Sequence, residues 1–474
     1  MTGALARRDV AIAFVAAAVA YVAYLGLATE GTWRIDAPTR FGRVFSAVAL
    51  NLLHGRFDVD PELLLYEAYV RDGLAYPYFG IFAALARLPL IPFADLTVVH
   101  VGRPLAALAA ALAAMFQALA MLHATAGARS PALRGILAAL PLVAGPQVYL
   151  LARPNMYEEA ALWGLCWASA VVAAGVCLAL RDGRAPVRLY IALAAAAGLA
   201  VTARVTAGLG ACAFAALVGA ARLWWEARAA GKEPLRRLLG REAASATLAG
   251  AVPIAVQLAV NFARWRNPFE FADLARMAVV HESDPTRLPR LMAQGAFNLE
   301  RLWFGLQYYF APAWAFPTAA GAPRFEGWMR VWLDAAELPP STPLLTDGLL
   351  MALAAVGAWA ICRRGVPRPA IWAAGGAGLA TGAAVLMSAI YMALRYRVDI
   401  QPLLLWLGLA GAHRLTRAAP RLWLTATAAA ILAISVLGSL AMYAAYLDIN
   451  LGPAFPVHDP LREIYWSVRR HLIP

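Results

Sequence analysis

A series of apolar windows, each bounded by arginine or turn residues, dominates this chain. A helix of about 20 apolar residues is what crossing the hydrocarbon core of a bilayer requires. The composition agrees, since 62% of the 474 residues are hydrophobic and 15% are charged, against roughly 45–50% and 25% in soluble domains. The pattern predicts an all-α polytopic membrane protein with about 11 transmembrane helices. The predicted spans are residues 10–29, 97–124, 135–152, 157–180, 188–203, 205–224, 244–263, 346–362, 370–392, 402–413 and 422–446.

Several classes of protein are excluded by the charge pattern and the cysteines. The formal net charge is +13, but no dense basic stretch could follow a phosphate backbone, so nucleic acid is not an expected partner. The four cysteines lie in or beside apolar runs without a C-x-x-C pair, which argues against a disulfide framework and a thiolate metal site. The first apolar window lacks a clean cleavage site, so we expect a membrane helix rather than a removed signal peptide.

The distribution of arginine predicts the orientation in the membrane. Nineteen Lys and Arg residues fall in one set of connections, whereas the short connections of the other set hold only Arg153, Arg204, Arg395 and Arg397. Because basic residues are retained on the cytoplasmic side, we expect a multi-pass protein of a bacterial-type inner membrane, with a cytoplasmic N-terminus and an external C-terminus. Of the 28 acidic residues, 23 then lie outside, which indicates that the working face is external.

Two external loops are too long to be simple connections, and the whole chain, residues 1–474, is interpreted as one integral membrane domain. The loops cover about residues 30–96 and 264–347, and an external amphipathic tail covers about 447–474. In the first loop, apolar residues at helical spacing predict a juxtamembrane amphipathic helix near 41–54. A second short helix is expected to begin at Asp60, as an N-cap, and to end at Gly73.

This organisation resembles that of the GT-C glycosyltransferases, polytopic enzymes that use polyprenyl-phosphate-linked sugars. An early loop aspartate after the first span is part of the likeness, and one departure is Trp265-Arg266, where the family usually has F-G. The local strings that carry the resemblance are Asp72–Gly80 (D-G-L-A-Y-P-Y-F-G), Met156–Glu159 (M-Y-E-E), Gly198–Arg204 (G-L-A-V-T-A-R), Asn261–Phe271 (N-F-A-R-W-R-N-P-F-E-F) and Arg395–Pro402 (R-Y-R-V-D-I-Q-P).

The resemblance implies a hexosyl- or pentosyltransferase that acts on the external face. It would move a sugar from a polyprenyl-phosphate-linked donor to a glycan, lipid or protein acceptor, with inversion at the anomeric carbon. Such a reaction needs cations that stabilise the departing phosphate and a base near the acceptor hydroxyl. The expected partners are this donor, membrane lipids and the acceptor. No Gly-rich phosphate loop or dinucleotide fingerprint stands out.

Two aspartates of the first loop are candidate catalytic bases. The resemblance places the catalytic carboxylate at Asp36, although this residue could also cap a helix that opens at Pro38. Asp58 is the second candidate, and with Asp60 it forms a D-x-D pattern that could bind a divalent cation. Asp60 is explained equally by its position before Pro61, as a helix N-cap. No metal ligand is therefore assigned, and a divalent cation is left open as a cofactor.

Three external arginines, Arg204, Arg395 and Arg397, are candidates for binding the donor phosphate. A planar guanidinium suits bidentate contact with phosphate oxygens. The alternatives are that these side chains extend to lipid headgroups, or that they pair with Asp399.

Four further residues are candidates for binding substrate. Tyr76 and Tyr78 could stack on a sugar, although an interfacial aromatic belt explains them equally well. Glu158 and Glu159 could bind the acceptor, or they could offset the positive end of a helix dipole.

The competing function is a transporter or flippase of a lipid-linked or anionic substrate. Transporters often contain paired broken helices and internal symmetry, and here the long loops are placed asymmetrically and no repeat is apparent. A polymerase or ligase of surface polysaccharide would share the donor chemistry, but usually concentrates its polar residues in one late loop.

Overall fold

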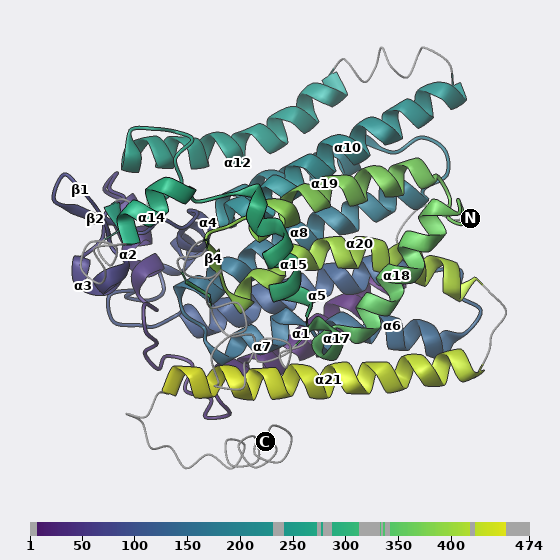
Figure 1. Ribbon diagram of the computed structural model, residues 1–474, viewed down its shortest axis with the longest axis horizontal. Coiled ribbons are helices and arrows are strands. Elements are labelled where there is room, and N and C mark those ends of the chain that lie inside the picture. The colour runs from purple at the N-terminus through teal and green to yellow at the C-terminus, as the bar shows by residue number, and fades with distance from the viewer. Residues whose placement is uncertain are drawn as a thin grey trace.

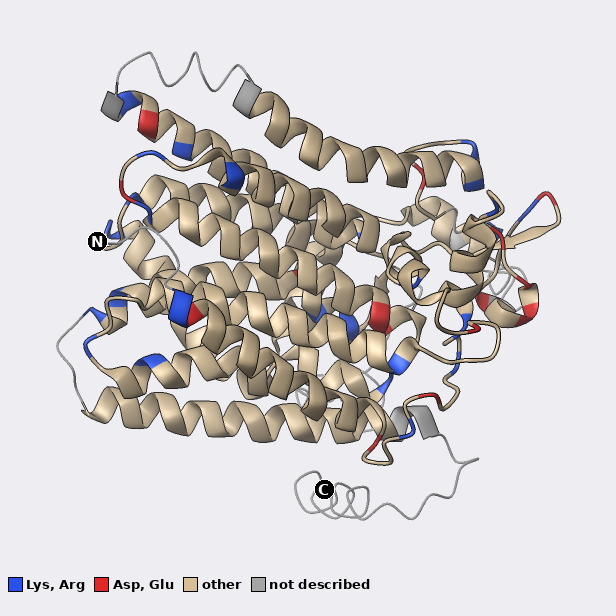
Figure 2. Ribbon diagram, turned by 180° about the vertical axis from the view of Figure 1, so that it is seen from behind, with Lys and Arg blue, Asp and Glu red and all other residues tan. Residues whose placement is uncertain are grey.

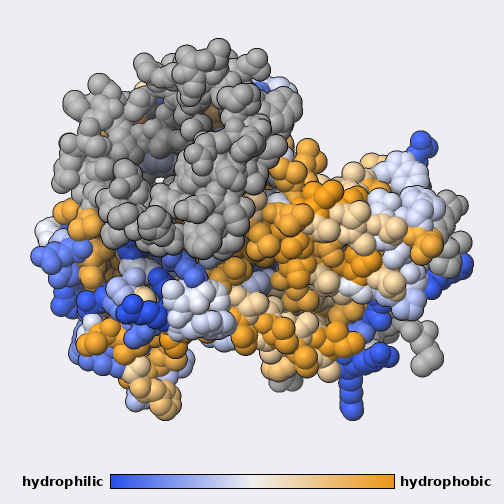
Figure 3. Space-filling view, turned by 90° about the horizontal axis from the view of Figure 1, so that it is seen from below, coloured by the Kyte–Doolittle hydropathy of each residue, from blue (hydrophilic) through white to orange (hydrophobic). Residues whose placement is uncertain are grey.

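The computed structural model describes residues 7–230, 241–272, 276–277, 287–311, 332, 335–336, 342–417 and 422–451. Within these ranges, eight helices are long and apolar enough to cross a membrane, and two more, α9 and α18, are shorter and apolar. The protein is therefore a multi-pass membrane protein. Exposed apolar side chains such as Phe14, Leu248 and Leu437 belong to helices of this kind, and Figure 3 shows an apolar surface over one flank of the bundle.

The described helices follow the predicted windows closely. A helix of 20 residues, α20, covers the window at 402–413 without being among the eight, so the total of 11 spans stays a prediction. The long helices are α1 (Arg7–Ala28), α5 (Gly102–Ala124), α6 (Pro131–Val143), α8 (Met156–Leu180), α9 (Val187–Ala203), α10 (Val205–Ala230), α12 (Arg241–Trp265), α18 (Gly348–Cys362), α19 (Pro369–Met387), α20 (Arg397–Thr416) and α21 (Leu422–Leu451).

Three windows are shortened or broken in the structure, whereas others, such as those of α10 and α20, extend beyond the predicted ends. α5 begins at Gly102 rather than at 97, with Pro104 in its first turn. The window 135–152 is broken at Gly145, whose φ is +100°, into α6, α7 (Pro146–Tyr149) and the 3-10 helix η3 (Leu150–Ala152). α19 ends at Met387, and the residues after it form the short strand β4 (Tyr391–Met392). Pro104 is tolerated in the first turn of α5, the positive φ of Gly145 breaks the second window, and a strand follows the end of α19.

The bundle has two unlike ends. The end that carries α2 (Val44–Leu52), α3 (Pro61–Leu64), the hairpin strands β1 (Tyr69–Arg71) and β2 (Leu74–Tyr76), and α14 (Arg287–Gln294) is called the loop end below (Figure 1). The N-terminus lies at the opposite end (Figure 1). Asp and Glu lie mainly at the loop end, whereas Lys and Arg mark most of the opposite end (Figure 2).

Asp60 begins a helix in the first loop segment as predicted, but this helix is shorter than predicted. Asp60 is the N-cap of α3, because its side chain accepts a hydrogen bond from the Glu62 backbone amide. The helix does not run to Gly73. It gives way to the 3-10 helix η1 (Leu65–Glu67) and then to the β1–β2 hairpin, in which Asp72 and Gly73 both have positive φ. An Asp-Gly pair with two left-handed residues is a preferred hairpin turn, and this preference overrides the helix-stop interpretation.

The chain between Asp36 and α2 differs from the prediction, whereas α2 itself agrees with it. No helix opens at Pro38, since residues 37–39 are irregular and α2 begins at Val44, so Asp36 is not a helix cap. The predicted amphipathic helix is confirmed as α2, with Val44, Phe45 and Val48 buried. The tail beyond residue 451 lies outside the described residues.

Close approach of α18 and α20 depends on glycine. A Cβ added to Gly357 would stand 1.8 Å from the Leu407 carbonyl oxygen, and one added to Gly411 would stand 2.0 Å from that of Leu353. Both obstacles are backbone atoms, so a side chain at either position would have to separate the helices.

We therefore expect Gly357→Ala to destabilise the bundle by about 1–3 kcal/mol, the usual effect of overpacking a tight core. Thermal unfolding of the purified protein in detergent would show this as a lower Tm. Gly135→Ala is the matched control, because nothing lies within 4 Å of a Cβ built there. Equal melting of both variants would contradict the proposed contact.

Candidate functional site

The α9–α10 reversal places an arginine at the loop end of the bundle. α9 ends at Ala203 and α10 begins at Val205, so Arg204 alone forms the turn, with extended backbone angles. Its Nε donates to both carboxylate oxygens of Asp399, at 3.0 and 2.8 Å, and the Thr206 hydroxyl donates to the same group at 2.9 Å. The Asp399 side chain is fully buried. The pairing with Asp399 considered for the external arginines is thus present at Arg204.

A second arginine joins this pair through aromatic rings. Arg204 and Arg395 stack over the ring of Tyr396, at 4.7 and 5.3 Å from its centroid, and Arg395 also stacks over Tyr157 at 4.6 Å. These five residues, Arg204, Arg395, Tyr396, Asp399 and Tyr157, are called the Arg204 cluster below. Apart from Asp399 they are half-buried. Stacking engages the faces of the guanidinium groups, and their N–H donors lie at the edges.

Arg397 does not join this cluster. It follows Arg395 by two positions at the start of α20, is 4% exposed, and its charge acts on the Tyr149 hydroxyl. Its charge also acts on Asp347. The three arginines predicted to act together are therefore divided between the Arg204 cluster and a second, interior group.

Glu67 of η1 is a carboxylate that the sequence interpretation missed. Its charge acts on the hydroxyls of Tyr157, Tyr69 and Tyr78. Because it lies in the run Leu63–Val70, where it is the only charged residue, a lone acid in an apolar stretch is the signal that could have identified it. Glu67 brings a second negative charge to the Arg204 cluster.

Tyr78 and Tyr76 have different surroundings. Burial raises the pKa of the Tyr78 hydroxyl, and the charges of Arg395 and Arg204 act on this group in the opposite direction. Tyr78 therefore borders the Arg204 cluster. Tyr76 packs against Trp265, with ring centroids 5.6 Å apart, and is 9% exposed. Trp265, at which the sequence departs from the family pattern, thus packs with the hairpin in an aromatic core.

Tyr309 approaches the cluster from the second loop segment. It lies on α15 (Leu302–Phe310), is fully buried, and its hydroxyl has no hydrogen-bond partner among the described residues. Burial raises the pKa of this hydroxyl, on which the charges of Asp399 and Arg204 also act. Side chains from both loop segments therefore lie close to the α9–α10 turn and to the start of α20.

Asp36 lies in a surface segment whose continuation packs on the start of α8. Its side chain is exposed and makes no hydrogen bond or ion pair within the described residues, although its charge acts on His100. Farther along, the Thr39 hydroxyl donates to the Pro154 carbonyl oxygen at 3.4 Å, and the Phe41 ring lies edge-on to Tyr157 at 6.1 Å. The segment thus reaches a residue of the Arg204 cluster five positions after Asp36.

Asp58 and Asp60 are engaged separately. Arg56 donates to both oxygens of Asp58, and this hydrogen bonding lowers the pKa of the Asp58 carboxyl. Asp60 caps α3. Among the described residues, no group of three or more His, Cys, Asp or Glu could hold a metal ion. The D-x-D pattern is therefore explained by an ion pair and a helix cap.

The paired glutamates at the start of α8 are both buried at 1% exposure. The two carboxylate oxygens of Glu159 accept hydrogen bonds from Arg87, at 2.6 and 2.8 Å. Arg87 is fully buried, and it also donates to the Ala83 carbonyl oxygen and the Ser46 hydroxyl. This bidentate pair fastens the first loop segment to α8.

Comparisons with known proteins give a distant structural likeness. No family model and no curated protein matches the chain. The archaeal oligosaccharyltransferase AglB from Archaeoglobus fulgidus, in complex with an inhibitory peptide and a dolichol-phosphate, is 14% identical with a TM-score of 0.47, over 92% of this chain and 56% of that one. ArnT from Cupriavidus metallidurans, bound to undecaprenyl phosphate, is 16% identical with a TM-score of 0.42, over 97% of this chain and 68% of that one. The chain spans just over half the length of the oligosaccharyltransferase.

The Arg87–Glu159 pair gives a prediction about stability. Glu159→Gln would leave the Arg87 charge buried without its carboxylate, and breaking such a pair costs about 3–5 kcal/mol. Asp72→Asn, in an ion pair with Arg71 whose acid is 75% exposed, should cost under about 1 kcal/mol. Thermal unfolding of the two variants measures the difference, and similar melting temperatures would show that the buried pair is not needed.

Proposed function

We propose that this protein is a GT-C-type membrane glycosyltransferase. It would transfer a hexose or pentose from a polyprenyl-phosphate-linked donor to a glycan, lipid or protein at the loop end. We place the loop end outside an inner membrane, with a cytoplasmic N-terminus. The observation that carries the proposal is the Arg204 cluster, in which two half-buried arginines flank one tyrosine at the loop end of an apolar bundle. Binding of a lipid-linked phosphate needs cations at the end of a membrane bundle, which these two arginines supply.

The charges of the cluster suggest separate roles for its two arginines. Asp399 accepts from Arg204 with both oxygens, so much of that charge is already balanced. Arg395 stacks over the rings of both Tyr157 and Tyr396, which fixes its guanidinium group beside that of Arg204. In our proposal Arg395 is the main donor-phosphate ligand, Arg204 assists it, and Arg397 supports α20 from the interior. Charge-assisted bonds of this kind are the strong ones.

The reaction we propose is a direct displacement. The acceptor oxygen attacks the anomeric carbon as the bond from this carbon to the phosphate oxygen breaks. The proton of the acceptor hydroxyl goes to Asp36, which is exposed and can meet an acceptor from solvent. The negative charge that develops on the phosphate is stabilised by Arg395 and Arg204. Glu67, Tyr78 and Tyr157 supply the carboxylate and aromatic faces that would contact the sugar.

Arg395→Gln should reduce sugar transfer roughly 10²–10³-fold, the usual loss on removing one donor to a developing oxyanion. The assay is transfer from polyprenyl-phospho-sugars by the purified full-length protein in detergent. Arg266→Gln, at an exposed loop-end arginine, is the matched control and should retain activity. Binding of the lipid donor by the wild type without any turnover would instead favour the transporter reading.

Asp36→Asn should reduce transfer roughly 10²–10⁴-fold, as expected for loss of a general base, with little change in donor KM. Asp72→Asn, at another exposed acid of the first loop segment, is the control for the same chemical change. Should Asp36→Asn retain full activity and Glu67→Gln abolish it, Glu67 would replace Asp36 as the base.

A further inference from the structure

Three helix breaks meet inside the bundle below the Arg204 cluster. α6 and α7 break at Gly145, α17 (Pro343–Thr346) and α18 break at Asp347, and the 3-10 helix η7 (Leu394–Tyr396) turns into α20 at Arg397. Ser439 of α21 joins the first two breaks, because its hydroxyl accepts from the Gly145 amide at 3.0 Å and donates to the Thr346 carbonyl oxygen at 3.3 Å. Broken helices at membrane depth need such partners for their released backbone groups.

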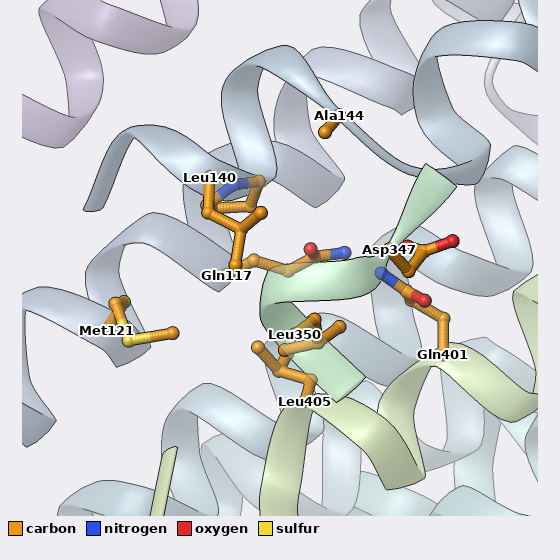
Figure 4. A pocket seen from close by; sticks show the side chains of 9 residues that line it. Gln117, Met121, Leu140, Ala144, Asp347, Leu350, Gln401 and Leu405 are labelled. Atoms are coloured by element: carbon orange, nitrogen blue, oxygen red, sulfur yellow. The ribbon is translucent and has the colours of Figure 1, made fainter. Parts of the chain in front are cut away.

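Asp347 lies where these breaks converge. It is 4% exposed, it accepts a hydrogen bond from the Thr346 hydroxyl at 2.6 Å, and its side chain lines the same small cavity as that of Gln401 (Figure 4). A Cβ added to Gly145 would stand 3.0 Å from a carboxylate oxygen of Asp347. The positive φ of Gly145 and this contact together explain why a glycine occupies the break.

The first turn of α20 is fixed on two sides by alternate residues. Arg395 and Asp399 belong to the Arg204 cluster, whereas Arg397 and Gln401 interact with Tyr149 and Asp347. A rotation of this turn would therefore move both groups at once.

The cavity beside Asp347 is too small to bind a substrate. Figure 4 shows Gln117, Asp347 and Gln401 around a cavity whose other labelled side chains, such as Met121 and Leu350, are apolar. The cavity has a volume of about 10 Å³, at the lower limit for a single water molecule. Since ionisable residues inside a membrane are costly, a group that binds no substrate needs another reason to be there.

We propose that Asp347 is a positioning residue, which acts through Arg397 and Gln401 to hold the first turn of α20 so that Arg395 can bind the donor phosphate. Asp347 is also the end of the second loop segment, which contacts the chain before α20 in several other places, among them a strand pairing and a hydrogen bond. The strand β3 (Ala335–Ala336) pairs with β4, and Arg301 donates to the Ser388 carbonyl oxygen at 3.2 Å. The second loop segment thus fixes the phosphate ligand without touching the phosphate. This inference rests on the proposed function for its effect on catalysis.

The test uses two variants of the full chain. Asp347→Asn removes the charge that faces Arg397. The double variant Asp347→Leu with Arg397→Met removes both charges, which commonly preserves folding when a buried pair is replaced by apolar residues. Both should raise the KM for the polyprenyl-phospho-sugar donor roughly two- to thirtyfold, with a smaller change in kcat. Asp182→Asn is the matched control, because Asp182 pairs with Arg368 at the opposite end of the bundle.

A second measurement does not depend on catalysis. Hydrogen–deuterium exchange of the ligand-free protein should be faster at residues 388–401 in the double variant than in the wild type, and unchanged there in Asp182→Asn. Unchanged exchange in this segment would overturn the inference whether or not the protein is a transferase. If exchange is faster but the protein neither binds nor turns over any donor, Asp347 does hold the first turn of α20 in place. The proposed transferase function would then be contradicted. Faster exchange with an unchanged donor KM would overturn the link to Arg395.

Discussion

The contact between Arg204 and Asp399 is the constraint on which the loop end depends. Two membrane helices reverse direction at one residue, and the guanidinium group released there would be costly to bury alone. The carboxylate that accepts it comes from a turn 195 positions away along the chain, so one interaction fixes both the reversal of α9 into α10 and the start of α20. Because Tyr396 and Arg395 precede α20 directly, their placement follows from the same contact.

The sequence predicts the bundle better than it predicts the site, for physical reasons. Each apolar window must satisfy its own backbone inside the membrane, so its length and composition are decisive. The breaks are set by local preferences that compete, as at Asp72-Gly73, where a hairpin turn prevails over a helix end. The division of Arg395 from Arg397 depends on partners from distant helices, Tyr157 for one and Tyr149 for the other. No spacing along the chain contains that information.

The candidate site mixes charges of both signs, which distinguishes it from a simple anion trap. Arg204 is balanced by Asp399, and Glu67 lies beside the tyrosines that also surround Arg395. Asp36 stays at the surface on a segment that reaches Tyr157 through Phe41. Carboxylates and cations are thus separated by aromatic rings rather than paired throughout. Such an arrangement can bind an anion and still offer a proton acceptor at its margin.

Gly80 is the point at which the first loop segment comes into close contact with the membrane helices. A Cβ at this position would stand 2.1 Å from the Thr202 carbonyl oxygen, and the next amide, of Ile81, donates to Gln257 at 3.0 Å. Gly80 and Ile81 are therefore held against α9 just before Arg204 and against α12 (Arg241–Trp265). The β1–β2 hairpin upstream is held separately, by Arg71 at the Arg264 carbonyl oxygen and by Tyr76 at Trp265. A shift of the hairpin would therefore be passed through Gly80 to the end of α9, where Arg204 forms the turn.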